Sequence, residues 1–207
     1  MPEKTTENNK EAVEEGEFFP TPREVVYALL ESPLVNLPGG RWIEPCAGTG
    51  RLISAVNEKR DDVTWTICEL NKMFRPNLQR VMGLNDELLG FGDFVHRRWD
   101  YPMADVLIMN PPFTLTMQFV LAAMKRARIV VLFQRQAWFG SKQRSPWLYR
   151  HSPDRHQLGW RPSFRPDGKV DNCDYNWYVW PEGSATGRPW GISSMLPKPI
   201  GGQLQLL

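Results

Sequence analysis

The apolar positions of the chain gather in short runs that alternate with amphipathic segments. The runs that predict buried strands are residues 41–46 (RWIEPC), 63–70 (VTWTICEL), 88–95 (LLGFGDFV), 104–110 (ADVLIMN) and 128–134 (RIVVLFQ). The segments that predict helices are 22–32, 51–60, 71–82 and 114–127. We expect Thr21 to cap the first helix, with Pro22 in its first turn, and Pro76 to lie in the first turn of the third helix. Alternating strands and helices indicate an α/β fold with a mostly parallel sheet and helices on both faces.

The last third of the chain follows another pattern. Residues 156–164 (HQLGWRPSF) and 176–180 (NWYVW) flank a turn-rich segment, which predicts an antiparallel hairpin. Residues 1–16 are polar and acidic and predict a disordered tail. Residues 182–207 are rich in Gly, Pro and Ser and predict an irregular tail. The folded domain is therefore expected to span residues 17–181.

Composition narrows the class of protein. The chain has 207 residues, enough for one domain with a full core. Hydrophobic residues make up 42% and charged residues 23%, as in ordinary globular proteins, and no apolar run approaches the roughly 20 residues that span a bilayer. The N-terminus has no apolar core of the kind that signal peptides contain. Because the three cysteines are few and odd in number, we expect a cytoplasmic protein.

Charge is unevenly distributed although the net charge is only +2. Between Lys125 and Arg165 there are ten Lys or Arg residues and one acid, Asp154, interleaved with aromatic residues. Such a segment suits phosphates and unstacked bases. A solvated basic surface without a partner is the alternative.

Two glycines and two acids follow the ends of predicted strands. Gly48 and Gly50 lie between the first strand and its helix, where backbone amides can approach a ligand. The third glycine of a dinucleotide fingerprint would stand at position 53, which is Ile53, so NAD and FAD are disfavoured. Glu69 ends the second strand, where a carboxylate can accept ribose hydroxyls, and Asp93 can accept from an adenine amine. An adenosine-containing cofactor is the better interpretation, although each acid alone could be a helix cap or a surface charge.

The fourth strand ends abruptly in Asn110-Pro111-Pro112-Phe113. Two prolines remove backbone donors and force extended geometry, so they stop the strand and present Asn110 at its tip. Ligands of α/β sheets bind at such strand ends. An amide and an aromatic ring are therefore held where a ligand is expected; a plain strand-ending turn is the alternative.

With these motifs the chain resembles class I S-adenosylmethionine-dependent methyltransferases, and most closely the small, phage-type DNA methyltransferases that act on adenine N6. Glu44-Pro-Cys-Ala-Gly-Thr-Gly50 matches the glycine loop of that family, and Asn110-Pro-Pro-Phe113 matches its catalytic tetrapeptide. The resemblance implies that S-adenosyl-L-methionine is bound by Glu44, Cys46, Ala47, Gly48, Gly50, Glu69, Asp93 and Asn110. The segment FFPTP resembles the part of the family that covers the methionine end of the cofactor, which adds Phe19 and Thr21.

The resemblance also implies a Rossmann-like, seven-stranded sheet and a catalytic site made of Asn110, Pro111, Pro112 and Phe113. Acceptors at Asn110 and Pro111 would hold the two N–H groups of a flipped adenine, and Phe113 would stack on its ring. The expected partner is double-stranded DNA, with Arg135, Lys142 and Arg144 as candidate phosphate contacts. One or two of these cations could instead pair with acids such as Asp154.

Other readings of the same motifs stay open. The amine could belong to RNA, to cytosine N4 or to a protein glutamine, or the chain could be an inactive relative that binds nucleic acid. No target-recognition insertion of substantial size is evident in the sequence. His151, His156 and Cys173 lack the paired spacing of a zinc site, so no metal is expected, and nothing in the sequence marks His96 as catalytic. Cys46 and Cys68 read as small buried residues and not as nucleophiles.

Overall fold

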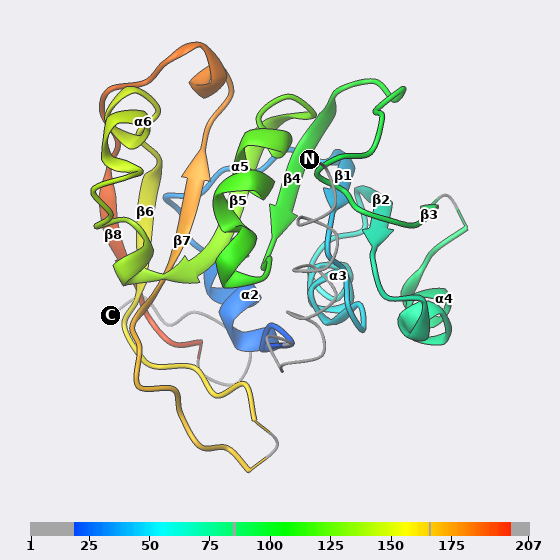
Figure 1. Cartoon of the computed structure of the whole chain (residues 1–207). Coiled ribbons are helices and arrows are strands. Elements are labelled where there is room, and N and C mark those ends of the chain that lie inside the picture. The colour runs from blue at the N-terminus through cyan, green and yellow to red at the C-terminus, as the bar shows by residue number, and fades with distance from the viewer. Residues whose placement is uncertain (1–18, 85, 166, 200–207) are drawn as a thin grey trace.

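The computed structural model describes residues 19–84, 86–165 and 167–199, and for residues 88–90 the backbone only. The predicted acidic tail, residues 1–16, lies outside the described residues. Eight strands form one mixed sheet with the order β3-β2-β1-β4-β5-β7-β6-β8, which runs across the molecule from one side to the other (Figure 1). The strands are β1 (Gly40–Glu44), β2 (Val63–Glu69), β3 (Glu87–Phe91), β4 (Ala104–Met109), β5 (Ala127–Arg135), β6 (Asp154–Leu158), β7 (Tyr175–Trp180) and β8 (Ser193–Leu196).

The predicted mostly parallel sheet with an antiparallel C-terminal hairpin is confirmed. Strands β1 to β5 pair in parallel, and β7 runs antiparallel to both β5 and β6. Because the carboxyl ends of β1, β2 and β4 meet at one edge, the loops that follow them lie together. The segment joining β6 to β7, residues 159–174, is longer than the predicted turn and extends beyond that same edge (Figure 1).

Helices cover both faces of the sheet, as predicted. They are α2 (Arg23–Leu30), α3 (Arg51–Asn57), α4 (Arg75–Val81), α5 (Thr116–Ala123) and α6 (Ser145–Arg150). Side chains of α2, α3 and α4 pack in one core with Trp42 and Trp177, while those of α5 and α6 pack in a second core with Ile43 and Trp180. Neighbouring strand residues therefore contribute to opposite cores, as the pleat requires.

Two predictions about local structure are wrong. Thr21 does not cap α2: the N-cap is Pro22, without a side-chain bond, because the Thr21 hydroxyl accepts a hydrogen bond from Asn110 instead. Residues 182–207 were predicted to be irregular, but Ser193–Leu196 form β8 and add an eighth strand to the expected seven, parallel to β6. Its attachment is held by tertiary contacts that composition does not reveal, including a salt bridge of 2.8 Å between Arg188 and Asp154. Pro76 lies in the first turn of α4, as predicted.

One hydrogen bond ties the last part of the sheet to the first helix. The indole Nε1 of Trp177, on β7, donates to the carbonyl oxygen of Val25, on α2, at 3.0 Å, and both residues are fully buried. Since α2 directly follows Phe19 and Thr21, this contact also places the segment that precedes the helix.

We expect Trp177→Phe to lower the free energy of unfolding by about 1–3 kcal/mol, because it removes this hydrogen bond and leaves a small cavity. Urea denaturation followed by circular dichroism measures the change. The matched control is Trp190→Phe: that indole is 67% exposed, and the change should stay within about 0.5 kcal/mol. Equal effects at both positions would contradict this account of the α2 contact.

Candidate cofactor and catalytic site

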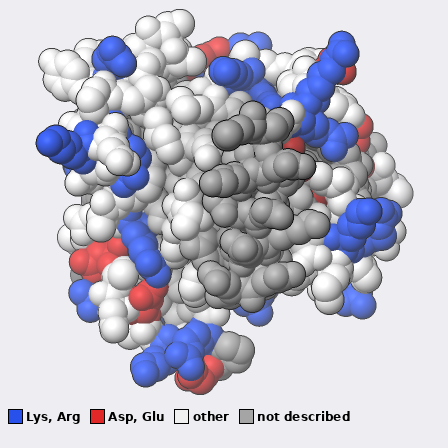
Figure 2. All heavy atoms as spheres, viewed as in Figure 1, with Lys and Arg blue, Asp and Glu red and all other residues white. Residues whose placement is uncertain are grey.

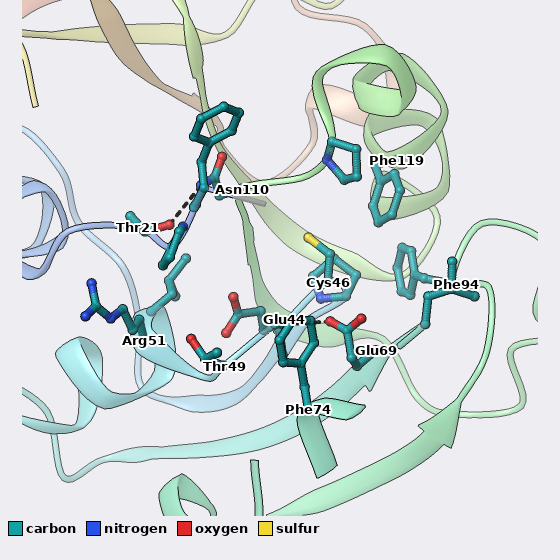
Figure 3. A pocket seen from close by; sticks show the side chains of 18 of the residues that line it. Thr21, Glu44, Cys46, Thr49, Arg51, Glu69, Phe74, Phe94, Asn110 and Phe119 are labelled. Carbon is teal, nitrogen blue, oxygen red and sulfur yellow. Dashed lines mark hydrogen bonds between the residues drawn. The ribbon is translucent and has the colours of Figure 1, made fainter. Parts of the chain in front are cut away.

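A cleft opens at the carboxyl ends of β1, β2 and β4 (Figure 3). Its empty space is about 960 Å³, counting the space that is open to solvent. The predicted residues that line it are Phe19, Thr21, Glu44, Cys46, Ala47, Gly48, Glu69, Asp93, Asn110 and Pro112. Residues from sequence positions 19 to 112 thus meet in one place, as the convergence of parallel strand ends requires.

The Glu69 carboxylate holds the glycine loop in shape. One of its oxygens accepts from the Gly48 backbone N–H at 2.6 Å, and the other accepts from Asn71 N–H at 2.8 Å. Gly50 does not line the cleft; it has a φ of 76°, and a Cβ there would lie 2.6 Å from Val81. Gly50 is therefore required by a left-handed turn and by close packing against α4.

Glu44 is a buried carboxyl at the end of β1, and its Oε2 atom has no hydrogen-bond partner among the described residues. Burial raises the pKa of Glu44 well above its usual range, and the neighbouring Glu69 carboxylate raises it further. Burial also raises the pKa of Glu69, against the lowering effect of its backbone hydrogen bonds. Two carboxyl groups in one cleft favour a positively charged ligand group.

Burial also raises the pKa of the Cys46 thiol well above its usual range, and the carboxylates of Glu44 and Glu69 act in the same direction. A thiol is nucleophilic only as the thiolate. Cys46 therefore lines the cleft as a neutral thiol.

The loop after β3 presents Asp93 and Phe94 to the cleft. The Asp93 Oδ1 atom accepts from the Val95 N–H at 2.8 Å, and its Oδ2 atom lies 2.7 Å from the His96 ring. Asp93 thus shapes its own loop as well as lining the cleft, and His96, which the sequence left without a role, is its partner.

Arg126 fixes the path of the loop that follows β3. Its guanidinium is buried and donates hydrogen bonds to the carbonyls of Phe94, Val95 and Arg97. The same guanidinium lies 4.3 Å from the centroid of the Phe94 ring. A residue that looked like part of a basic surface is therefore structural.

At the other end of the cleft stands the tetrapeptide that follows β4. The Asn110 Nδ2 atom donates to the Phe19 carbonyl at 2.9 Å and to the Thr21 hydroxyl oxygen at 3.0 Å (Figure 3). The Phe113 ring stacks on Phe19, with centroids 5.5 Å apart and 15° between the planes. The Arg135 guanidinium lies 4.3 Å from the Phe113 centroid. Pro111 and Phe113 adjoin the cleft in sequence but do not line it.

The three candidate phosphate contacts are placed differently from one another. Arg135 lies beside Phe113 and is 3.7 Å from Asp171. Arg144 is committed to its own loop, because its guanidinium donates to the Trp138 carbonyl at 2.7 and 3.0 Å. Lys142 is exposed. Helix α6, which follows, leads away from the cleft end of the sheet (Figure 1).

Figure 2 shows the basic side chains of one face in separate groups and not as one continuous surface. Several of the cations between Lys125 and Arg165 are engaged by acids of the chain. Those pairs are Arg128–Glu182, Arg135–Asp171, Arg161–Asp174 and Arg165–Asp167. Asp154 pairs with Arg188 and not with one of these cations.

Sequence reasoning missed several residues of the cleft: Pro20, Pro45, Thr49, Arg51, Leu52, Leu70, Phe74, Gly92, Phe94, Leu115 and Phe119. Phe94 and Phe119 stack with centroids 5.8 Å apart and close one end of the cleft (Figure 3). In the sequence, Phe94 follows Asp93 directly and Phe119 follows the tetrapeptide. These two motifs were the only local signals that pointed to this part of the cleft. Arg51 had no such signal, since a cation at the start of a helix is unremarkable.

The described part of the chain has no candidate metal cluster and no candidate membrane-spanning helix. Its His, Cys, Asp and Glu side chains do not assemble into any group of three that could hold a metal ion. None of its helices combines the length and hydrophobicity needed to cross a bilayer.

Comparison with known proteins identifies the fold. No protein-family model matches the chain, and no curated protein does. Among solved structures, the methyltransferase subunit of a type I restriction-modification system from Streptococcus thermophilus matches with a TM-score of 0.63 and 14% identity, over 80% of this chain and 45% of that subunit. This chain therefore spans less than half the length of that subunit.

Two further structures are similar over longer shares of their own length. A protein described as a predicted O-methyltransferase from Agrobacterium tumefaciens has a TM-score of 0.58 and 16% identity, over 87% of each chain. A dimethyladenosine transferase from Plasmodium falciparum has a TM-score of 0.56 and 11% identity, over 82% of this chain and 64% of that one. The chain has the Rossmann-like methyltransferase fold, with the antiparallel hairpin at its C-terminal end.

The buried carboxyls generate a prediction about pH. Because the pKa of Glu44 is raised in the folded state, the native protein keeps a proton that an unfolded Glu loses above about pH 4.3. The free energy of unfolding of the ligand-free protein should therefore fall as pH rises from there through the raised pKa. Glu44→Gln should flatten this fall and be more stable than the unsubstituted protein at about pH 8.

Urea titrations at several pH values measure this effect. Part of the fall should survive in Glu44→Gln, because the pKa of Glu69 is raised as well. Glu182→Gln, at a mostly exposed carboxylate paired with Arg128, is the control and should leave the slope unchanged. An unaltered slope in Glu44→Gln would contradict the assignment.

Proposed function

We propose that this protein is an S-adenosylmethionine-dependent methyltransferase that methylates the exocyclic N6 amine of adenine in DNA, with the target base flipped out of the duplex. The observation that carries the proposal is the state of the Asn110 side chain. Both N–H bonds of its amide are used within the protein, so its oxygen is the atom left to meet a substrate in the cleft. The glycine loop and the methyltransferase fold also support the proposal.

The cleft fits the proposed cofactor. S-Adenosylmethionine ends in an ammonium and a carboxylate, and the buried, unpartnered Oε2 of Glu44 fits the ammonium. Arg51 fits the carboxylate, because it is the one Lys or Arg among the described residues that line the cleft. Glu69 would accept from the ribose hydroxyls, and Asp93, Phe94 and Phe119 would surround the adenine. When bound, the cofactor supplies a methyl group activated by a positively charged sulfur.

The residues of the tetrapeptide would contribute by holding the target amine in the orientation that the transfer needs. An adenine amine is a weak nucleophile, since its lone pair is delocalised into the ring. The Asn110 oxygen and the Pro111 carbonyl would accept its two N–H bonds and draw the nitrogen toward tetrahedral geometry. Asn110 is neutral and takes no proton, so the proton lost after transfer goes to water. Rate acceleration would come from orientation and from exclusion of water.

Phe113 would receive the flipped base. Stacking on its ring replaces part of the stacking lost from the duplex. The ring already stacks on Phe19 and lies beside the Arg135 guanidinium, so the base would enter a site with aromatic and cationic neighbours. Planar bases stack on guanidinium groups as well as on rings.

The activity in the name of the dimethyladenosine transferase supports an adenine amine, and the restriction-modification subunit is by its name a methyltransferase. The same chemistry would serve an amine of RNA, of cytosine N4 or of a glutamine side chain, and these are outcomes of the test. The purified protein is incubated with methyl-labelled S-adenosylmethionine and, in parallel, duplex DNA, RNA and protein extract. Mass spectrometry of the labelled nucleosides then identifies the product.

We expect N6-methyladenine in DNA. Asn110→Ala should lower kcat by about 100-fold or more, as removal of one positioned hydrogen-bonding group does elsewhere, while the Kd for the cofactor changes by no more than a few fold. Asn36→Ala, at an exposed Asn, is the control and should keep full activity. Methyl label in RNA or in protein would overturn DNA as the substrate and leave the chemistry proposed for the site in place. An active Asn110→Ala would overturn the site.

The exposed Lys142 offers a test of DNA contact. Lys142→Ala should weaken binding to duplex DNA and reduce the slope of log K against log salt by about 1, because one phosphate contact is lost. Lys59→Ala is the control: this lysine pairs with Glu31 at 2.6 Å. Fluorescence anisotropy at several salt concentrations measures both. An unchanged slope for Lys142→Ala would remove it from the DNA-binding surface.

A further inference from the structure

The segment before α2 is attached to the catalytic tetrapeptide by contacts of two kinds. The Phe19 carbonyl and the Thr21 hydroxyl receive the two hydrogen bonds of the Asn110 amide, and the Phe19 ring stacks on Phe113. Residues 89 and 91 positions apart in sequence thus form one unit, and Phe19 touches both functional side chains of the tetrapeptide.

The Phe19 carbonyl decides which way the Asn110 amide points. A carbonyl oxygen can only accept, so the atom 2.9 Å from it must be the amide nitrogen. Rotating the amide by 180° would place oxygen against oxygen at that distance. The Thr21 hydroxyl alone would not decide the orientation, because it can donate or accept. It supplies the second acceptor, and at 5% exposure little water competes for it.

The chain holds these acceptors rigidly. Pro20 and Pro22 flank Thr21 and restrict the backbone on both sides. The Phe19 ring is also held edge-on by Phe164, with centroids 5.6 Å apart. Phe164 belongs to the long segment between β6 and β7, so the clamp is supported from two separate parts of the chain.

We infer that Phe19 and Thr21 are positioning residues that lock the Asn110 amide with its oxygen toward the substrate, and so restrict the site to groups that donate hydrogen bonds. This inference rests on the proposed function for its link to substrate. With both N–H bonds occupied, Asn110 has no donor for a carbonyl or ring nitrogen. Adenine and cytosine present an exocyclic amine that fits, whereas the carbonyl edge of thymine does not.

The lock also explains why this chain carries Asn and not Asp at position 110. A carboxylate there would face the Phe19 carbonyl at hydrogen-bond distance without a proton to share. Asn110→Asp should therefore lose activity about as completely as Asn110→Ala.

The first test needs no substrate. Hydrogen exchange of the Asn110 side-chain amide is followed by NMR in the ligand-free protein, with the signal assigned by its loss in Asn110→Ala. We expect exchange at least 10-fold slower than for the exposed Asn36 amide, and several-fold faster exchange in Thr21→Val than in the unsubstituted protein. Exchange as fast as that of Asn36 would overturn the lock.

The second test is kinetic. Thr21→Val should lower kcat about 10-fold with less than a 3-fold change in the Kd for the cofactor, and Thr21→Ser, which keeps the hydroxyl, should restore most of kcat. Thr66→Val, at a similarly buried Thr on β2, controls for a folding effect and should keep kcat. A parallel loss of cofactor affinity and kcat in Thr21→Val would assign Thr21 to cofactor binding alone.

The outcomes separate the two proposals. Slow exchange at Asn110 together with no methylation of any amine would keep the lock and overturn the function. Fast exchange in an enzyme that methylates adenine would keep the function and overturn the lock.

Discussion

The bond from the Gly48 amide to the Glu69 carboxylate joins the ends of two neighbouring parallel strands, and the geometry of the cleft depends on it. Glu69 is almost fully buried, so this charge-assisted contact is not weakened by solvent. It bends the loop after β1 toward β2 and leaves Glu44 on the cleft floor. A second hydrogen bond lies beside it: the Ala47 N–H donates to the Cys68 carbonyl of β2 at 3.2 Å, so two bonds hold the loop against β2.

The cleft brings two buried carboxyl groups together. Glu44 and Glu69 are both buried in it, and one oxygen of Glu44 has no partner among the described residues. Buried carboxyls are tolerated when they are neutral or when a cation satisfies them. A cationic ligand would therefore bind to a carboxyl group that folding has already removed from water, so binding would not have to desolvate it. Affinity would come from this prior arrangement more than from contact area.

The sequence predicted the sheet, its antiparallel hairpin and ten of the 21 described residues that line the cleft, because strand ends are marked by local signals. Glycines, prolines and acids directly after apolar runs were sufficient to bring Glu44, Glu69, Asp93 and Asn110 together. The errors arose where a distant partner decides. Thr21 has the side chain of a helix cap, yet Asn110 competes successfully for its hydroxyl. Arg126 looks like a surface cation, yet its guanidinium is buried and donates hydrogen bonds to three backbone carbonyls. The short strand β8 depends on Arg188 and Asp154, which local pattern cannot pair.

The hydrogen bond between Trp177 and the first helix has a consequence for the timing of synthesis. Helix α2 and the Phe19–Thr21 segment are synthesised before β7, on which the helix packs and which is complete only at Trp180. Asn110 is translated between the two. The early segment must therefore wait for the late strand before it can dock stably. Such distant pairings slow folding, because the loop must close before the contact stabilises it. A nascent chain that ends between Phe113 and Trp177 would contain the tetrapeptide and the segment that contacts it, but not the indole that holds α2 in place.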